Sequence, residues 1–525
     1  MRLRILLTVA LVVVLVAVGS VSALAQKKVL RYGMAQADIG GMDPHNAPGT
    51  NDKTVIDPMF NGLVRFRPGS ANPEYIEPDL AERWEVSPDG LVWTFYLRRG
   101  VQFHKGYGEL TAEDVVYSLE RARDPQRSAF SSDFVIFSKI EALDRYTVRI
   151  TLARPVPAVQ VLGVLTDYQG GMIISKKAAE EFGSNFRMNP IGTGPFQFAE
   201  YVPRQYVRLV RNEQYFRGTP EVEEIVYRFM PELRSRELAF RAGELDIIEG
   251  QREQWWVEEI SKVPGTIVDV VGPGEMRTLH YNMSRPPFDD IRVRQAISYL
   301  INRDEIVEII GPSVTVPAYS PVPPGYMAHT DDVERYDYNP QKAKQLLAEA
   351  GYPNGLHIGP VIISEVESLL VPMQIIQEQL AREGVTMDLQ VVDHQTFHER
   401  IRQNMSNMVL YGAARFPTPD QYLTQFYHSA STVGKPTAVT NFSHYGSVIP
   451  GVDNLIDMAR VELNQQRQVE MWQLAQKLIT RDVPTLPLYV LKLVFVRKDY
   501  VDLGYEFEST ISLTPQFNEK TRLLK

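Results

Sequence analysis

The amino terminus constrains this chain most, because it sets the compartment in which the chain folds. Arg2 and Arg4 precede an apolar run at residues 5–18, and Ala23-Leu24-Ala25 follows that run. This three-part pattern is typical of a secretory signal peptide. The apolar run is shorter than the about 20 residues that a membrane-spanning helix needs. We therefore expect residues 1–25 to be removed and the mature chain to begin at Gln26.

The cysteine content then limits how an exported chain can be stabilised. The sequence has 525 residues and 0 cysteines. It therefore forms no disulfide and has no cysteine at the cleavage site that could carry a lipid, so we do not expect a lipoprotein. Stability must come from buried apolar surface, and 44% of the residues are hydrophobic. A chain of this length predicts about two to four domains.

The charge of the chain argues against one class of partner. The formal net charge is −9, and removal of Arg2 and Arg4 leaves 53 basic against 64 acidic side chains. Nucleic acids bind basic surfaces, so we expect no nucleic-acid partner. The acidity is most simply related to solubility.

Strand and helix patterns alternate along the chain. Strands are predicted at residues 29–34, 92–97, 146–152, 225–230, 361–363 and 486–496. Helices are predicted from about residue 51, at 111–123 with Thr111 as the cap, and at 234–241, 371–382 and 466–479. This order favours an α/β sheet. The sequence has no internal repeat and no low-complexity linker, so short crossings are expected to join the domains.

Several strings resemble the family 5 bacterial extracellular solute-binding proteins, which include peptide and nickel carriers. The strings follow the order of the family over nearly all of the mature chain. They lie at residues 78–90, 93–98, 103, 110–118, 190–196, 243–246, 286–290, 293–296, 302–303 and 343–352.

The resemblance implies a specific α/β architecture, the periplasmic-binding-protein type II-like two-lobe clamshell with an extra subdomain inserted in lobe I. By analogy, lobe I takes residues 26–278 and 488–525, with the extra subdomain at about 71–185. Lobe II takes residues 279–487. Two crossings of the chain form the hinge.

The resemblance also implies a function. The protein is expected to be the periplasmic, monomeric substrate-binding component of an ABC importer, without a cofactor. It would capture a peptide-like or other small polar solute by lobe closure and deliver the solute to the permease subunits in the membrane. A solute shifts the open and closed populations only by its differential affinity for them, so both lobes must contact it.

Two positions depart from the peptide-binding relatives. Where those relatives carry an acidic residue for the ammonium group of the peptide, the alignment places Arg415. Where dipeptide-binding relatives carry an arginine for the carboxylate, Ile363-Ser364-Glu365 stands. A cation that faces an ammonium group in a dry cleft is unfavourable, so a peptide held by both termini is disfavoured. Arg415 suits a carboxylate, a phosphate or sugar hydroxyls. Alternatively, Arg415 pairs with Glu365 or a nearby aspartate, or points to solvent.

Further candidate ligand-binding residues come from loops that line the site in relatives. Aromatic side chains among them could stack on a solute or could pack in the core, and Gly412 would allow close approach of a ligand to the backbone. These candidates are Asn46, Pro48, Thr50, Gln251, Trp255, Tyr281, Tyr411, Gly412 and Ala413, beside Glu365 and Arg415.

The sequence also bears on other function classes. His394 and His398 have the i, i+4 spacing of a metal-binding helix face. A nickel or metal-chelate carrier is therefore an alternative function, unless the two histidines simply lie on a solvent-exposed face of the helix. No metal ligands are predicted among the site residues. A secreted hydrolase is disfavoured because the sequence has no Gly-x-Ser-x-Gly string and no cysteine nucleophile. We therefore expect no catalysis, whereas a chaperone or receptor role on the same fold stays open.

Overall fold

The computed structural model describes residues 27–525 apart from 47–49, 167, 416, 436–439, 511 and 513. The predicted signal peptide and Pro48 lie outside the described residues. No helix in the described ranges combines the length and the hydrophobicity of a membrane span.

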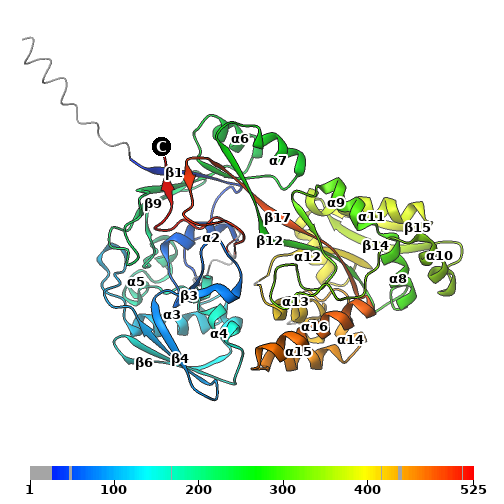
Figure 1. The fold of residues 1–525 in the computed structure, drawn as a ribbon, viewed down its shortest axis with the longest axis horizontal. Coiled ribbons are helices and arrows are strands. Elements are labelled where there is room, and N and C mark those ends of the chain that lie inside the picture. Colours follow the sequence, from blue (N-terminus) through cyan, green and yellow to red (C-terminus); the bar gives the residue numbers. More distant parts are fainter. Residues whose placement is uncertain are drawn as a thin grey trace, which may run out of the picture.

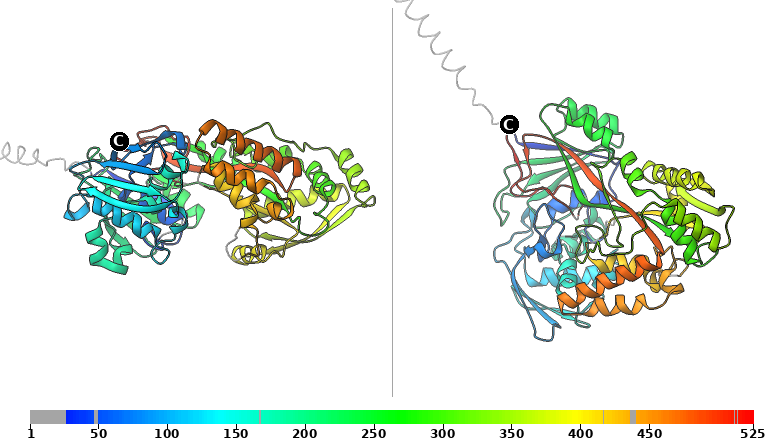
Figure 2. Two further views of the ribbon diagram at one scale, coloured as in Figure 1. Left: turned by 90° about the horizontal axis from the view of Figure 1, so that it is seen from below. Right: turned by 45° about the vertical axis from the view of Figure 1, so that its right-hand side comes forward.

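Two bodies lie side by side, and two long strands connect them (Figure 1). The same two bodies are seen from below and from an oblique direction in Figure 2. The predicted α/β architecture with two lobes is confirmed, with one mixed nine-stranded sheet in the order β16-β12-β17-β11-β1-β10-β9-β8 and β13 beside β17.

Lobe I is built on one half of this sheet. β1 (Val29–Met34) runs parallel to β10 (Glu224–Phe229) and to β11 (Ile247–Glu249), while β9 (Tyr206–Arg211) and β8 (Phe196–Val202) continue antiparallel. Helix α6 (Leu233–Arg241) connects β10 to β11, and α7 (Gln254–Ser261) follows β11. The side chains of Leu30, Tyr32 and Met34 alternate into a single core.

A second, four-stranded sheet belongs to the same body. Its order is β4 (Ala81–Val86), β5 (Val92–Leu97), β7 (Thr147–Leu152) and β6 (Phe137–Asp144). The same body contains helices α2 (Thr50–Ile56), α3 (Ala112–Arg123), α4 (Ala158–Val164) and α5 (Lys176–Phe182) and the hairpin of β2 (Val64–Phe66) and β3 (Ile76–Pro78), and α3 packs against β6 and β7. The α3 helix begins with a capping box between Thr111 and Asp114.

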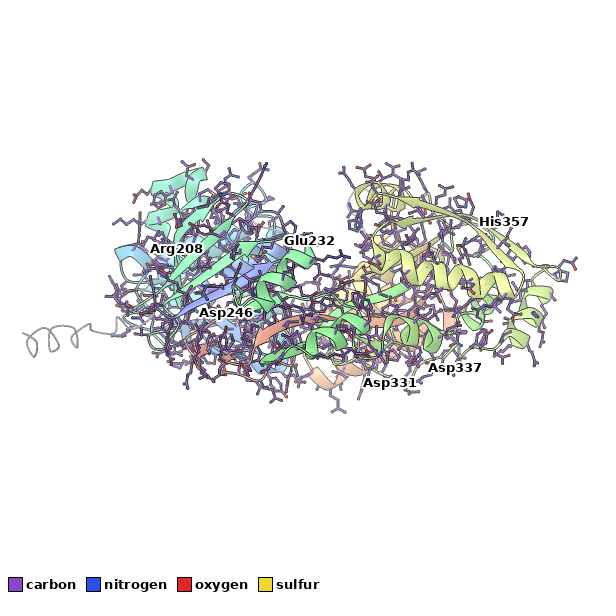
Figure 3. All side chains as sticks on the ribbon, turned by 90° about the horizontal axis from the view of Figure 1, so that it is seen from above. Arg208, Glu232, Asp246, Asp331, Asp337 and His357 are labelled. Atoms are coloured by element: carbon purple, nitrogen blue, oxygen red, sulfur yellow. The ribbon has the colours of Figure 1, made fainter. Side chains whose placement is uncertain are left out.

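The extreme carboxyl terminus returns to lobe I. β18 (Val501–Asp502) pairs with β19 (Arg522–Leu523). The buried carboxylate of Asp246, labelled in Figure 3, accepts hydrogen bonds from Tyr500 Oη at 2.7 Å and Lys525 Nζ at 3.1 Å. This contact attaches the last residue of the chain to the central sheet.

The connection between the lobes is an antiparallel ribbon of β12 (Thr266–Tyr281) and β17 (Thr485–Lys498). The register shifts between Val271 and Glu275, where Gly272-Pro273-Gly274 interrupts the ladder. Gly274 has φ +73°, and a Cβ atom there would lie 2.3 Å from the carbonyl oxygen of Leu491. Only glycine fits this position.

Lobe II surrounds the other end of the ribbon. β14 (Leu356–Ser364) and β15 (Val385–Val392) are parallel and are joined by α11 (Glu367–Arg382), while β16 (Met408–Ala413) pairs with β12. β13 (Thr315–Pro317) pairs with β17. The remaining helices are α8 (Ile291–Leu300), α9 (Arg303–Ile310), α10 (Pro340–Glu349), α12 (His394–Arg402), α13 (Pro419–Tyr427), α14 (Tyr445–Val448), α15 (Val452–Val461) and α16 (Gln465–Asp482).

The predicted elements differ from the observed ones mainly at their ends. The strands at residues 29–34 and 92–97 are found at the predicted bounds. Helix α11 begins at Glu367 and not near residue 371, because burial of Leu369 and Met373 holds the turn that precedes Pro372. The long strand β12 was not predicted, since its Gly-Pro-Gly string indicates a turn.

Candidate binding cleft between the lobes

A cavity of about 540 Å³ lies between the two lobes. One wall belongs to the segment of lobe I that leads from α3 through β6 and α4 to residue 171, and the other belongs to lobe II around α13 and α15. The first wall consists of Phe130, Asp133, Phe134, Val135, Ile136, Arg154, Gln160, Gly163, Val164, Tyr168, Gly170 and Gly171. The second consists of Ala414, Arg415, Thr418, Asp420, Gln421, Thr424, Gln425 and Arg460.

Arg415 lies in the loop between β16 and α13, half-buried at the cavity wall. Its Nε donates to Gln425 Oε1 at 2.6 Å, and its Nη1 donates to the carbonyl oxygen of Ala414 at 3.0 Å. The guanidinium carbon is 5.5 Å from the centre of the Phe426 ring. These partners are neutral, and no carboxylate of a described residue forms an ion pair with Arg415. The alternative pairing with Glu365 is therefore absent from the described residues.

Tyr168 lies on the opposite wall of the cavity. Burial, together with the carboxylates of Asp133 and Asp57, raises the pKa of Tyr168 to about 12, and Arg415 acts in the opposite direction. The Lys53 ammonium nitrogen lies 3.2 Å from the centre of the Tyr168 ring. An arginine of lobe II and a tyrosine of lobe I are thus within electrostatic reach of each other across the cavity.

Arg460 is a second cation of the lobe II wall, and acidic neighbours balance its charge. Its Nε lies 3.0 Å from Asp420 Oδ1, and its Nη1 lies 3.4 Å from Asp457 Oδ1. Gln160 Nε2 of lobe I donates to the carbonyl oxygen of Arg460 at 3.5 Å. This hydrogen bond joins the two lobes at the cavity.

The three predicted residues of β16 lie immediately before this loop. The ring of Tyr411 is half-buried, 5.1 Å from Phe442 and 6.0 Å from His398 between ring centres. The carbonyl oxygen of Ala413, a residue that is 5% exposed, accepts from Tyr422 Oη at 3.3 Å.

Gly412 has a specific structural reason to be glycine. A Cβ atom at Gly412 would lie 1.3 Å from Nη1 of Arg277. The guanidinium group of Arg277 therefore occupies the space that any side chain at residue 412 would need.

Two of the three predicted residues after β1 can be placed. Asn46 Nδ2 donates to Asp43 Oδ2 at 3.1 Å, and Asp43 in turn accepts from Arg121 Nη1 at 2.9 Å. Thr50 is the first residue of α2. Pro48 falls outside the described residues.

The other four predicted residues are dispersed. Trp255 on α7 is 57% exposed, and Gln251 lies half-buried in the loop before α7. Tyr281 is fully buried at the end of β12, where its hydroxyl lies 2.9 Å from Ser298 Oγ and its ring stacks on Phe288. Glu365 is exposed between β14 and α11. None of these four is among the described residues that line the cavity.

Sequence reasoning missed the lobe I wall of the cavity. Arg154, Gln160 and Tyr168 come from a segment without a recognised motif. The pair Gly170-Gly171 was the one available signal, since a Cβ atom at Gly171 would lie 2.3 Å from the carbonyl oxygen of Thr166. Such glycines mark close backbone approach, but they do not identify what lies beside it.

The predicted histidine pair lies on α12 beside the β16 strand. His394 Nε2 and His398 Nε2 are 3.2 Å apart, and His394 Nδ1 is 3.0 Å from Ser364 Oγ. Burial, together with the nearby His394 and Arg402, lowers the pKa of His398 to about 4. The described part of the chain holds no group of three or more His, Cys, Asp or Glu side chains that could bind a metal ion.

Comparison with known proteins connects this arrangement to a family. The family described as "Bacterial extracellular solute-binding proteins, family 5 Middle" matches residues 75–433. Di/tripeptide-binding protein 2 of Pseudomonas aeruginosa is 30% identical over 90% of this chain and 91% of its own length.

Solved structures agree over the whole fold. MoaA of A. tumefaciens R10, in complex with mannopinic acid, is 44% identical, covers 95% of this chain and 100% of its own, and superimposes with a TM-score of 0.81. The periplasmic binding protein DppA of Helicobacter pylori, in complex with the peptide STSA, is 28% identical with a TM-score of 0.76, over 95% of this chain and 98% of its own. Family members bind solutes without catalysis, which confirms the prediction that the protein is not an enzyme. The chain therefore belongs to the family 5 bacterial extracellular solute-binding proteins, and it is an ABC-transporter substrate-binding protein for peptides or other small solutes.

Proposed function

We propose that this protein is the periplasmic component of an ABC importer and that it captures an acidic organic solute, which it delivers to the permease in the membrane. The observation that carries this proposal is Arg415, a guanidinium group at the wall of a cavity of about 540 Å³ between the lobes. Its bonds to Gln425 and Ala414 leave its positive charge without a carboxylate partner among the described residues.

An acid group on the solute would supply that partner. Hydrogen bonds between a guanidinium group and a carboxylate are charge-assisted and are roughly twice as strong as neutral ones. Closure of the lobes would remove water from the cavity and strengthen the attraction further. An ammonium group at the same place would face Arg415 directly, so a peptide bound as in the peptide-binding relatives is disfavoured.

The class of solute is supported by one relative. MoaA, which is 44% identical to this chain, was solved in complex with mannopinic acid. Mannopinic acid carries carboxylates and sugar-derived hydroxyls, both of which suit arginine as a hydrogen-bond donor. We therefore take mannopinic acid as the first probe.

The proposal includes the division of the chain. Residues 1–25 would direct export, residues 26–278 with 488–525 would form lobe I, and residues 279–487 would form lobe II. Lobe I would include an extra subdomain at about 71–185. The ribbon of β12 and β17 would act as the hinge, and the wall residues of both lobes would contact the solute. Contacts from both lobes are what makes the closed form the preferred one when a solute is bound.

The test is a thermal-shift and calorimetry screen of the chain from Gln26 onward. Mannopinic acid, its carboxamide analogue, other organic acids and peptides with free termini would be compared at equal concentration. A solute at 100 times its dissociation constant stabilises the folded state by about 2.7 kcal/mol. We expect acids to shift the melting temperature and peptides with free termini to leave it unchanged. Tight binding of such peptides with no response to any acid would overturn the proposal.

A metal-chelate carrier is the second candidate, and it rests on the two imidazole nitrogens that lie 3.2 Å apart on α12. The low pKa of His398 keeps its ring neutral at pH 7, as metal binding requires. Titration with NiCl2 tests this candidate directly. A melting shift that His398→Ala removes, and that His357→Ala at the far end of lobe II (Figure 3) leaves intact, would support it. No shift with NiCl2 would exclude it.

A further inference from the structure

A second group of arginines lies on the ribbon that joins the lobes. Arg252 Nη1 donates to Glu275 Oε1 at 2.8 Å, and Arg277 Nη1 donates to Glu275 Oε2 at 2.8 Å. Burial opposes ionisation of Glu275, but the two guanidinium groups outweigh burial and lower the pKa of Glu275 to about 2. One carboxylate is therefore held between two arginines at neutral pH.

Arg277 has hydrogen-bonding capacity that Glu275 does not use. The residue is 3% exposed, and its Nη2 donates to Ser368 Oγ at 3.1 Å. Its Nε is buried and has no hydrogen-bond partner among the described residues. A buried donor without an acceptor is unfavourable, so such donors commonly have a functional reason.

The start of α11 adds to the positive character of this place. Ser368 belongs to the first turn of a 16-residue helix whose N-cap, Val366, provides no side-chain cap. The first backbone N–H groups of a helix have no partner within the helix, and the dipole makes that end positive. The guanidinium group of Arg277 thus lies against a helix end that favours an anion.

The group lies between the lobes and near Arg415. Arg252 comes from lobe I, whereas Ser368 comes from lobe II, and Glu275 follows the register shift of β12 directly. Arg277 pairs in register with Gly412, three residues before Arg415. Three residues of extended chain span about 10 Å.

We propose that Arg252 and Arg277 form a second acid-recognition site, and that Glu275 fills this site until a carboxylate of the solute displaces it. The inference rests on the proposed function and specifies the solute more closely. The solute would be an organic acid with two acidic groups, one for Arg415 and one for Arg277.

The exchange of one carboxylate for another has a physical advantage. Arg277 keeps a negative partner in both states, so no buried charge is left unpaired at any stage. The incoming carboxylate has two oxygens, and the unpartnered Nε of Arg277 together with one Nη atom matches that geometry. The side chain of Glu275 is 27% exposed, so the displaced carboxylate can turn toward water.

The test uses acetate as a probe, so that the solute is not needed; any binding of acetate at Arg415 is common to wild type and variants and cancels in the comparison. Wild type, Glu275→Gln and Glu275→Ala are melted at pH 7 in sodium acetate and in sodium chloride of equal ionic strength. We expect acetate to raise the melting temperature of both variants by at least about 1 °C more than that of wild type. Addition of Arg277→Met to either variant should remove the difference. Glu275→Gln retains the shape of the side chain, so it serves if Glu275→Ala does not fold.

Asp269→Ala is the matched control on the same strand, because it removes the carboxylate that faces a single arginine, Arg497, at 2.7 Å. It should lower the melting temperature without a specific response to acetate. An equal response of wild type and both Glu275 variants to acetate would overturn the second site and would leave the Arg415 proposal untouched. If mannopinic acid binds wild type, Glu275→Gln should bind it several-fold more tightly, since no charge competes; weaker or equal binding would also overturn the inference.

Discussion

Two arginines, one in each lobe, differ in what neutralises them. Arg121 of α3 is 8% exposed and donates to the carboxylate of Asp43 at 2.9 Å. Burial opposes ionisation of Asp43, but Arg121 outweighs that effect and lowers the pKa of the carboxyl group. Arg415 of lobe II is held by a side-chain amide and a carbonyl oxygen at a cavity wall. A cation with its counter-ion inside the fold serves structure, whereas one held by neutral oxygens beside a cavity is available to a charged guest.

Loss of Arg121 should have the largest effect of any change that probes this comparison. Arg121→Met leaves the carboxylate of Asp43 buried without its partner, which costs about 3–5 kcal/mol of unfolding free energy. Urea unfolding measures the loss. Addition of Asp43→Asn should restore part of the stability, because the remaining group is neutral. A loss below about 1 kcal/mol would show that Arg121 is no more structural than a surface arginine.

Arg415→Ala should act on binding and not on folding. Loss of one charge-assisted contact of about 1.5–3 kcal/mol weakens binding of mannopinic acid by roughly 10-fold to 100-fold. The unfolding free energy should change by less than about 1 kcal/mol, since no carboxylate is left unpaired. Calorimetry and urea unfolding of the same preparation give both values. Arg234→Ala, which removes an exposed arginine of α6 that does not line the cavity, is the matched control and should leave the affinity unchanged. If Arg415→Ala binds mannopinic acid as tightly as wild type, Arg415 does not contact the solute.

Asp57 extends the comparison to a buried acid. Both carboxylate oxygens of Asp57 are buried, and this burial raises its pKa to about 6, although Lys53 opposes the shift. The folded state therefore holds the proton more tightly than the unfolded chain. The contribution to stability is present below pH 4 and is lost as the pH rises to about 6. Asp57→Asn should reduce the difference in unfolding free energy between pH 7 and pH 5 by about 1–2 kcal/mol. If Asp57→Asn has the same pH dependence of the unfolding free energy as wild type, ionisation of Asp57 does not contribute to that dependence.

Arg460→Gln should have only a small effect on stability and on binding. Its ion pair with Asp420 is partly exposed, and such pairs contribute at most about 1 kcal/mol. Binding of mannopinic acid should nevertheless weaken a few-fold, because the carboxylate of Asp420 would then face the cavity without its counter-ion. Tighter binding in Arg460→Gln would mean that the solute does not approach this wall.

Local sequence patterns predicted many of the helices and strands, though not β12, and they did not predict the cleft. The strand at residues 92–97 follows from strict alternation, and the start of α3 follows from the Thr111 cap. Arg415 came only from alignment with relatives, since a single arginine after a strand has no distinctive pattern. Arg277 could not be found at all. Its importance depends on Gly412 and Ser368, which are brought beside it only by the fold.

The ribbon of β12 and β17 has a mechanical consequence for an importer. A pair of strands that keep their hydrogen bonds can twist and bend out of the plane of the sheet, whereas sliding of one strand along the other would break the hydrogen bonds. The register shift at Gly272-Pro273-Gly274 interrupts the ladder at one point, and in the proposed hinge motion we expect the ribbon to bend there. Opening of the two lobes by such bending would require no segment to unfold and refold. Binding of the solute would then carry no entropic cost for ordering a flexible linker, and the affinity would not be reduced by that cost.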